Sequence, residues 1–409
     1  MRLTVLLVAG LIGCSSAGKG RDSGLPADTS DDTATPSTTD EDLLRAAIAG
    51  ETDAEAALDA IFDSGGFPVA TDDGTFLFAC LCGDGDWRLA GDHDGWAGEA
   101  MSRSDDLWWA EVAIAEPDGS FYKFNSGDDW IPDPLARRYA YDDFGENSLV
   151  EASFGHLERG FAGAAHGLDP RWLRIWVPAG ASFTHALYVH DGQNLFDPAA
   201  FHGGWKLDQA IGDQPLLVVG LDNTAARFDE YTHTTDIISG QTYGGRADDY
   251  AALVADVRAQ MEARYGAASK TGLMGSSLGG LVSFVIAHAQ PGEWDAALSL
   301  SGTMGWGSIG TDNDTVLDLY AAAGHRDTAL FLDSGGGGSC VDTDGDGLND
   351  DAPDGSDNYC ENRQFADQLA ADGYTWEVDL WHWHEAGATH DEAAWAARVD
   401  RPIGIFMGL

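Results

Sequence analysis

The chain has 409 residues, of which 44% are apolar and 10% aromatic, so it can bury one large core or two moderate ones. We therefore expect two folded domains. Its 68 acidic side chains against 22 basic ones give a formal net charge of −46, which repels phosphate backbones and argues against nucleic acid as a partner. Because the acidic residues are spread over the whole chain, we interpret this charge as a solvated surface.

The first residues have the pattern of an export signal. Arg2 precedes an apolar run over residues 3–11, and residues 11–14 (Leu-Ile-Gly-Cys) resemble a bacterial lipobox with Cys14 as the lipid acceptor. This run is shorter than the roughly 20 apolar residues that span a bilayer. An ordinary secretory signal with an incidental cysteine is the alternative. Residues 15–42 are rich in Ser, Thr, Asp, Gly and Pro and predict a flexible tether, so we expect an exported lipoprotein held at a membrane.

Two short helices are expected after the tether, in a helical lead-in over residues 43–66. The second helix, over residues 52–64, opens with a capping box of Thr52 and Glu55. Residues 67–153 then show short alternating strands with frequent turns, which predicts a small all-β sandwich. This segment resembles early-set, glycogen-binding-like immunoglobulin domains, through residues 89–96, 108–109, 121–124 and 130–134. Exposed tryptophans could stack on sugars, but in so small a sandwich most of them are expected in the core.

Cysteine usage indicates an oxidising compartment. Cys340 and Cys360 bracket a polar insertion, residues 335–360, and we predict a disulfide at its base. Cys80 and Cys82 stand two apart in an apolar strand pattern, so we expect two buried thiols there in preference to a metal pair.

From residue 154 to residue 409, strand patterns alternate with helix patterns, which predicts a mainly parallel sheet flanked by helices. The expected helices cover residues 248–265 and 361–372. The expected strands cover residues 172–177, 186–190, 216–221, 271–274, 297–301, 329–333 and 375–381.

A nucleophile elbow follows the fourth of these strands. Residues 275–279 read Gly-Ser-Ser-Leu-Gly, a Gly-x-Ser-x-Gly pattern that places Ser277 on a tight strand-to-helix turn. The small residues on either side let strand and helix approach each other. A serine nucleophile needs a base, an acid and oxyanion donors. In hydrolases with such an elbow, the three catalytic side chains follow along the chain in the order Ser, acid, His. His390 lies near the C-terminus on an expected loop, whereas His382 and His384 are competitors within or just after an aromatic strand.

These residues resemble the Putative esterase family of α/β hydrolases, which includes enterochelin esterases, feruloyl and acetyl-xylan esterases and antigen 85 acyltransferases. The resemblance rests on residues 188–196, on residues 219–223 with Arg227 and 229–231, on residues 275–280, and on Gly387, His390, Glu392 and Trp395 near the C-terminus. The resemblance implies that Ser277 is the nucleophile, His390 the general base, and the backbone amides of Leu278 and Gln193 the oxyanion hole. It also implies that the substrate cleft is lined by Asp191, Arg227, Glu230 and Tyr231.

The acid departs from the family pattern. A carboxylate is expected soon after the strand at residues 329–333, but here a Gly-rich run and the insertion follow. Asp357, just before the next helix and followed closely by an aromatic residue, is the first choice by resemblance, and Asp333 is the second. A Ser–His pair without an acid is the third possibility.

The insertion contains a calcium-loop spacing. Alternate carboxylates and a glycine at residue 347 resemble thrombospondin type-3 and EF-hand-like loops. The predicted structural Ca²⁺ ligands are Asp342, Asp344, Asp346, Leu348 and Asp350. Pro353 stands where such loops carry their last glutamate, and a solvated acidic loop without metal is the alternative.

Together these patterns predict a lipid-anchored serine carboxylic ester hydrolase that needs no cofactor for catalysis. The substrate classes implied by the resemblance are a siderophore-type lactone and an acylated polysaccharide or phenolic ester. Two other functions stay open: an acyltransferase with the same catalytic residues, and a catalytically silent, calcium-dependent surface binding protein. The oligomeric state is not predicted.

Overall fold

The computed structural model describes residues 38–349 and 357–409. The predicted signal, Cys14 and most of the tether lie outside the described residues, as does Asp350. Within the described ranges, no helix combines the length and the apolar character that crossing a bilayer requires.

Two helices open the described chain, as predicted for the lead-in: α1 (Asp40–Ile48) and α2 (Ala54–Ser64). The cap of α2 differs from the prediction. Asp53, not Thr52, is its N-cap residue, because the Asp53 carboxylate accepts a hydrogen bond from the Ala56 amide. Both helices bury their apolar faces in a shared cluster that includes Leu44, Leu58 and Leu77.

Two sheets face each other in the β-rich region that follows. One has the strand order β1-β2-β6-β5 and the other contains β3, β4, β7, β8, β9 and β10. Their bounds are β1 Val69–Ala70, β2 Phe76–Cys80, β3 Arg88–Gly91, β4 Glu99–Ala100, β5 Ser102–Ser104, β6 Leu107–Val112, β7 Phe121–Ser126, β8 Asp129–Ile131, β9 Arg138–Asp142 and β10 Gly145–Leu149. Trp87 and Trp108 are in the core between the sheets, whereas Trp130 is exposed. The early-set assignment and sugar binding stay predictions.

The larger region is built on strands that run parallel from β14 onward in the order β14-β13-β17-β18-β19-β20, with antiparallel β12 and β11 at one side. The predicted α/β organisation with a mainly parallel sheet is therefore confirmed. The strands are β11 His156–Ala162, β12 Arg171–Val177, β13 His185–His190, β14 Leu216–Leu221, β17 Lys270–Ser276, β18 Ala296–Leu300, β19 Ala329–Ser334 and β20 Leu380–His384. The prediction for the last strand, residues 375–381, was wrong, because Asp379 bonds back to Thr375 and closes a turn there.

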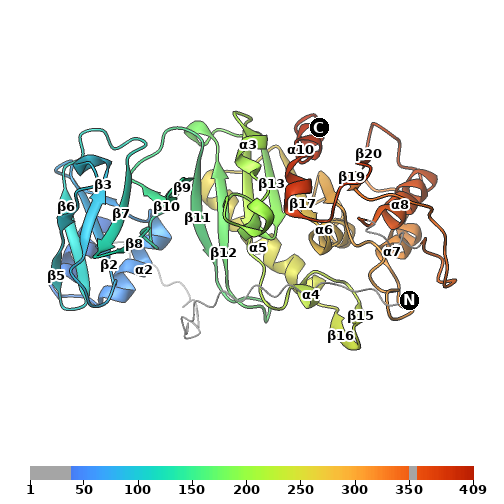
Figure 1. The fold of residues 1–409 in the computed structure, drawn as a ribbon, viewed down its shortest axis with the longest axis horizontal. Coiled ribbons are helices and arrows are strands. Elements are labelled where there is room, and N and C mark those ends of the chain that lie inside the picture. Colours follow the sequence, from blue (N-terminus) through green and yellow to red (C-terminus); the bar gives the residue numbers. More distant parts are fainter. Residues whose placement is uncertain (1–37, 350–356) are drawn as a thin grey trace, which may run out of the picture.

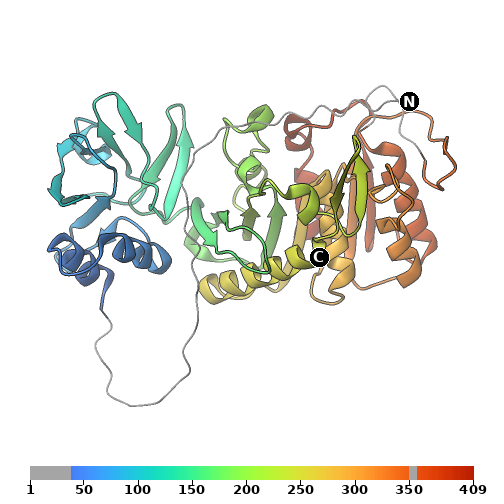
Figure 2. The same cartoon turned by 90° about the horizontal axis from the view of Figure 1, so that it is seen from below.

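Helices cover both faces of this sheet (Figure 2). Helices α5 (Ala247–Tyr265), α6 (Leu278–Ala289), α7 (Val316–Ala323) and α8 (Tyr359–Ala371) pack on one face. Helices α3 (Leu207–Ile211) and α10 (Asp400–Met407) pack on the other. Two short helices, α4 (Arg227–Glu230) and α9 (Glu392–Ala396), and the hairpin of β15 (Thr235–Ile238) and β16 (Gln241–Gly244) complete the region.

The two regions share one continuous sheet. β9 pairs with β11 through Tyr139 opposite Leu157 and Arg138 opposite Glu158, so the second β-sandwich sheet continues into the larger one. Figure 1 shows the resulting order along the molecule, from the N-terminal β strands through β9–β12 to β20. The predicted boundary near residue 153 lies between β10 and β11, but backbone hydrogen bonds cross it. The β region is therefore attached through its backbone as well as through side chains.

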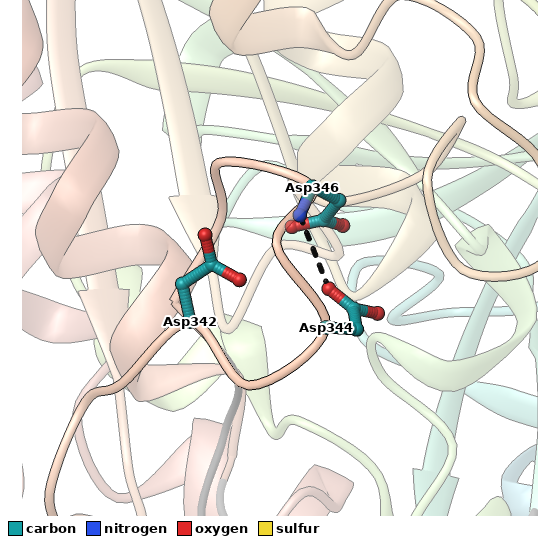
Figure 3. A group of neighbouring side chains, drawn as sticks. All are labelled: Asp342, Asp344 and Asp346. Carbon is teal, nitrogen blue, oxygen red and sulfur yellow. Dashed lines mark hydrogen bonds between the residues drawn. The ribbon is translucent and has the colours of Figure 1, made fainter.

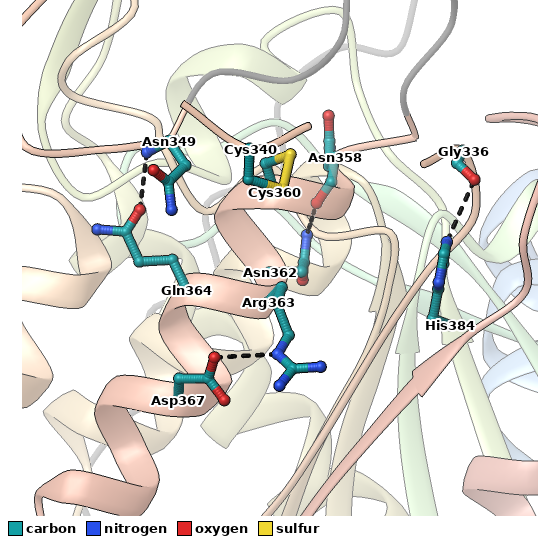
Figure 4. Close-up of a disulfide and its surroundings, with 10 residues drawn as sticks. All are labelled: Gly336, Cys340, Asn349, Asn358, Cys360, Asn362, Arg363, Gln364, Asp367 and His384. Carbon is teal, nitrogen blue, oxygen red and sulfur yellow. Dashed lines mark hydrogen bonds and ion pairs between the residues drawn. A yellow bond between two sulfur atoms is a disulfide. The ribbon is translucent and has the colours of Figure 1, made fainter. Parts of the chain in front are cut away.

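Both cysteine pairs form disulfides. Cys340–Cys360 is present as predicted and joins the insertion to α8 (Figure 4). The prediction of two buried thiols at Cys80 and Cys82 was wrong, since these residues are disulfide-bonded to each other. The reason is that β2 ends at Cys80, so Cys82 is free of strand geometry and its sulfur can turn back.

A buried carboxylate, Glu158 of β11, lies where the two regions meet. It accepts hydrogen bonds from Tyr265 (2.7 Å) and His156 (3.2 Å), and Arg264 of α5 and Arg138 of β9 approach it at 3.6 and 3.9 Å. Burial alone would raise the pKa of Glu158, but these donors and charges lower it to about 2. The ionised form therefore stabilises the folded state.

We predict that Glu158→Gln lowers the free energy of unfolding at pH 7 by roughly 2–3 kcal/mol. Because the folded pKa is depressed, this contribution is present above the ordinary glutamate pKa and is lost as the pH falls toward about 2. Urea unfolding of both proteins at pH 7 and pH 3 measures it. The matched control is Glu262→Gln, a more exposed helix pair with Arg258. An equal difference at both pH values would contradict the prediction.

Candidate active site

Ser277 stands at the turn from β17 into α6 with φ 55° and ψ −125°, a strained conformation for a residue with a side chain. Gly275 permits this turn, because a Cβ atom there would lie 2.4 Å from the backbone of Gly279. The strand and the helix approach each other closely at this point, as the elbow pattern predicts.

His390 and Asp357 are brought together from distant parts of the chain. His390 Nδ1 lies 2.5 Å from Asp357 Oδ1. Asp357 is fully buried just before α8, whereas the His390 side chain is 36% exposed. A histidine held at one nitrogen by a buried carboxylate presents the other nitrogen for proton transfer.

The competing residues make other contacts. Asp333, at the end of β19, accepts hydrogen bonds from Arg398 and from the Ser301 amide. His384 stacks on Tyr359 and bonds the Gly336 carbonyl (Figure 4), and burial lowers the pKa of His382 to about 4. None of the three contacts Ser277 through a hydrogen bond among the described residues.

The Ser277 hydroxyl has a neighbour that the sequence patterns missed. Its Oγ lies 3.4 Å from Thr303 Oγ1, which also accepts a hydrogen bond from Asn358 Nδ2 at 3.3 Å. Asn358 directly follows Asp357. Asn358 therefore contacts the site beside Ser277, through Thr303, while the adjacent Asp357 contacts His390. Within the described residues, no direct hydrogen bond joins Ser277 and His390. No local motif marks Thr303, because its position depends on the end of β18 lying beside the elbow.

Two backbone amides lie beside the elbow. Leu278 is the first residue of α6 and Gln193 is in the loop after β13, and neither amide donates to another group in the described part of the chain. The loop and the helix are in close contact, since a Cβ atom on Gly279 would lie 3.2 Å from Asp191 and 3.3 Å from His190. Free amides at a helix N-terminus suit a developing negative charge.

The loop after β13 is held by a buried polar network. Arg227 binds both carboxylate oxygens of Asp191 at 2.8 Å, and Asn223 donates to the same carboxylate at 2.6 Å. The Asn223 amide donates to Gln193 Oε1 at 3.0 Å, which fixes the Gln193 side chain. Burial alone would raise the pKa of Asp191, but Arg227 lowers it below its ordinary value. Burial lowers the pKa of the neighbouring His190 to about 3, so its ring is neutral.

Glu230 and Tyr231 do not line an open cleft, which differs from the expectation. Glu230 forms a buried, two-point ion pair with Arg171 at 2.9 and 3.1 Å. The Tyr231 hydroxyl accepts from the Asp191 amide at 3.2 Å, and its side chain is fully buried. Asp191 is also buried, and Arg227 is the most exposed of the four. Arg227 of α4 and Tyr231 just after it hold the loop through their bonds to Asp191.

In the insertion, Asp342, Asp344 and Asp346 converge on the surface (Figure 3). One carboxylate oxygen from each lies within 4.8 Å of the others. Their loop is joined to α8, since Gln364 bonds both the Asn349 amide and the Gly347 carbonyl at 2.7 Å (the Asn349 contact is in Figure 4). Leu348 is partly buried against the core, and Asp350 lies outside the described residues.

A parallel sheet between helices, with a serine on the strand-to-helix turn and a histidine–carboxylate pair, defines an α/β hydrolase. The model of the Putative esterase family matches residues 174–402, more than half of the chain. The chain belongs to the Putative esterase family and is a carboxylic ester hydrolase.

Solved structures show similar folds at low identity. Ferric enterobactin esterase from Salmonella typhimurium is 14% identical over 85% of this chain and 98% of its own, with a TM-score of 0.45. An IroE-like serine hydrolase from Shewanella oneidensis is 18% identical over 61% and 78%, with a TM-score of 0.47. MPT51 from Mycobacterium tuberculosis is 15% identical over 62% and 98%, with a TM-score of 0.44. No curated protein sequence matches the chain.

The burial of Glu230 yields a prediction about stability. Glu230→Gln leaves Arg171 without its counter-charge inside the protein, so we expect the free energy of unfolding to fall by about 2–4 kcal/mol. Glu293→Gln, whose side chain is 68% exposed, is the control and should change it little. Urea unfolding measures both. A variant of normal stability with only a raised KM would instead place Glu230 in the cleft.

Proposed function

We propose that Ser277, His390 and Asp357 form the catalytic triad of this esterase. The single observation that supports the proposal most is the 2.5 Å contact between His390 Nδ1 and the buried Asp357, because no local pattern requires it. The strained backbone at Ser277 and the adjacent free amides agree with it.

In this mechanism His390 takes the Ser277 proton through Nε2 as Ser277 Oγ attacks the ester carbonyl. The negative oxygen of the tetrahedral intermediate accepts hydrogen bonds from the amides of Leu278 and Gln193. The carbon–oxygen bond to the alcohol then breaks, and His390 returns the proton to the leaving oxygen. Water, deprotonated by His390, attacks the acyl-enzyme and releases the acid and free Ser277. Asp357 orients the ring and balances its positive charge.

For this mechanism the Ser277 hydroxyl must reach the His390 ring. Within the described residues it contacts Thr303 and not His390, so Oγ has to come within hydrogen-bond reach of His390 Nε2 when substrate binds. Thr303, which accepts a hydrogen bond from Asn358, holds the Ser277 hydroxyl before substrate binds.

The proposed substrates are a siderophore-type lactone or an acylated polysaccharide or phenolic ester. Both classes carry the ester carbonyl that the mechanism needs, and both are implied by the sequence resemblance. The β region is proposed as an early-set, immunoglobulin-like domain. The exposed Trp130, whose ring centre lies 6.1 Å from that of the half-buried Trp96, is the place where it could contact a sugar.

We also propose an exported lipoprotein anchored through Cys14. The apolar run before Cys14 and the polar tether after it support this location. Two disulfides in a chain with five cysteines agree with an oxidising compartment.

The acidic loop is proposed to bind a structural Ca²⁺. Three carboxylates at EF-hand-like spacing support it, because such charges repel one another without a cation. Asp342, Asp344 and Asp346 would supply side-chain oxygens, with Leu348 and Asp350 completing the predicted set. The role is structural, since the loop is tied to α8 near Asp357.

A fluorophosphonate probe tests the triad. The wild type should be labelled on Ser277 and Ser277→Ala should not be, whereas Ser308→Ala should label normally. His390→Gln and Asp357→Asn should react about 10²–10⁴-fold more slowly, because the base is lost or misoriented. An unlabelled wild type would support the silent binding protein instead. Ester products formed in added glycerol would indicate the acyltransferase.

Calcium binding is tested through stability. Asp344→Ala combined with Asp346→Ala should melt lower than the wild type in calcium and like it in chelator, because binding stabilises only the folded state. At free calcium ~100-fold above Kd the effect is ~3 kcal/mol. The exposed turn variant Asp72→Ala with Asp73→Ala is the control. Equal melting of the wild type with and without calcium rules the site out.

A further inference from the structure

Behind the His390–Asp357 pair lies a buried arginine shared by two carboxylates. Arg398, between α9 and α10, is 2% exposed. Its Nε and Nη2 bind the two oxygens of Asp333 at 2.9 and 3.2 Å, and Nη2 also reaches Asp357 Oδ2 at 3.2 Å. Burial lowers the pKa of Arg398, but Asp333 and Asp357 together raise it above its ordinary value. The guanidinium is therefore charged.

The two oxygens of Asp357 have different tasks. Oδ1 faces His390, whereas Oδ2 accepts hydrogen bonds from Ser301 Oγ at 2.5 Å, the Gly335 amide at 2.7 Å and Arg398. The Ser301 hydroxyl is itself contacted by Arg398 Nη2 at 2.6 Å and by Trp395 Nε1 at 3.1 Å. These hydrogen bonds fix the plane of the Asp357 carboxylate, and with it the direction of the His390 ring.

The charges of the cluster do not cancel. Burial raises the pKa of Asp333 to about 6. Above that pH, two carboxylates and one guanidinium leave one negative charge, and the closer, two-point contact of Arg398 is with Asp333. Asp333 therefore opposes most of the arginine charge, so that the charge of Asp357 stays available to an imidazolium at His390. Without Asp333, Arg398 would pair with Asp357 alone and would repel that imidazolium.

The displaced acid explains why such a cluster is needed. Asp357 arrives from the insertion and not from the end of β19, where Asp333 stands. The Cys340–Cys360 disulfide ties the following helix to the insertion (Figure 4), while Arg398 connects Asp357 back to β19.

We propose that Asp333 and Arg398 are positioning residues that set how much negative charge Asp357 presents to His390. This inference rests on the proposed triad and adds two residues that do not touch substrate. The charged and titratable groups facing one another in the described cluster are Asp333 of β19, Asp357 before α8, Arg398 after α9 and His390 before α9. The neighbouring Ser301 and Trp395 are neutral.

The test compares Asp333→Asn with the double variant Asp333→Asn, Arg398→Met. Asp333→Asn keeps the shape of the side chain but leaves the Arg398 charge less opposed, which disfavours the imidazolium at His390. The acidic limb of the plot of kcat/KM against pH should therefore move to lower pH by about 0.5–1 unit. We expect kcat to fall about tenfold with KM nearly unchanged. The double variant removes both charges and should return the limb to the wild-type position. Hydrolysis of 4-nitrophenyl acetate and fluorophosphonate labelling provide the readouts.

A structural role alone would not move the limb, and it would not be reversed by a second substitution. Asp256→Asn, an exposed pair with His166, is the control and should leave the limb in place. The same shifts should appear in the NMR titration of the His390 ring in the Ser277→Ala background, which needs no activity. An unchanged limb and ring titration in Asp333→Asn would overturn the inference, whereas loss of wild-type labelling would overturn the proposed triad.

Discussion

The site depends on one buried carboxylate, Asp357, facing a half-exposed histidine. Removing a carboxylate from water is costly unless donors surround it, and here Ser301, Gly335 and Arg398 supply them on the side away from His390. Each donor comes from a different element: the end of β18, the end of β19 and the segment after α9. The contact with His390 therefore exists only when the carboxyl end of the sheet and the C-terminal helices are assembled together.

A second constraint acts at the other side of the elbow. Ser277 is held in a strained conformation by the close approach of β17 and α6, and the loop after β13 presses against the first turn of that helix. The buried pair of Asp191 with Arg227 holds this loop, and the buried pair of Glu230 with Arg171 joins α4 to β12. Of the residues expected to line the substrate cleft, Asp191 and Glu230 are thus buried in ion pairs.

The sheet joins these features to the rest of the molecule. β9 and β11 extend it from the larger region into the β region, with Glu158 binding groups on both sides of the join. The chain has only 22 basic side chains against 68 acidic ones. Three of the basic side chains, Arg171, Arg227 and Arg398, each form an ion pair with a buried carboxylate. What matters for the site is that these three arginines lie beside Glu230, Asp191 and Asp333.

The sequence by itself determined the parallel sheet, the elbow at Ser277 and the Cys340–Cys360 bridge, because alternation, glycine spacing and a cysteine pair around a polar insertion are local signals. It indicated His390 and Asp357 only as candidates. The tertiary structure decided the contact between His390 and Asp357, the burial of Glu230 and the Cys80–Cys82 bridge. It also decided where the last strand ends and where Thr303 and Arg398 lie. These features depend on which chain segments meet and on which charges share one buried space, and no spacing along the chain records that.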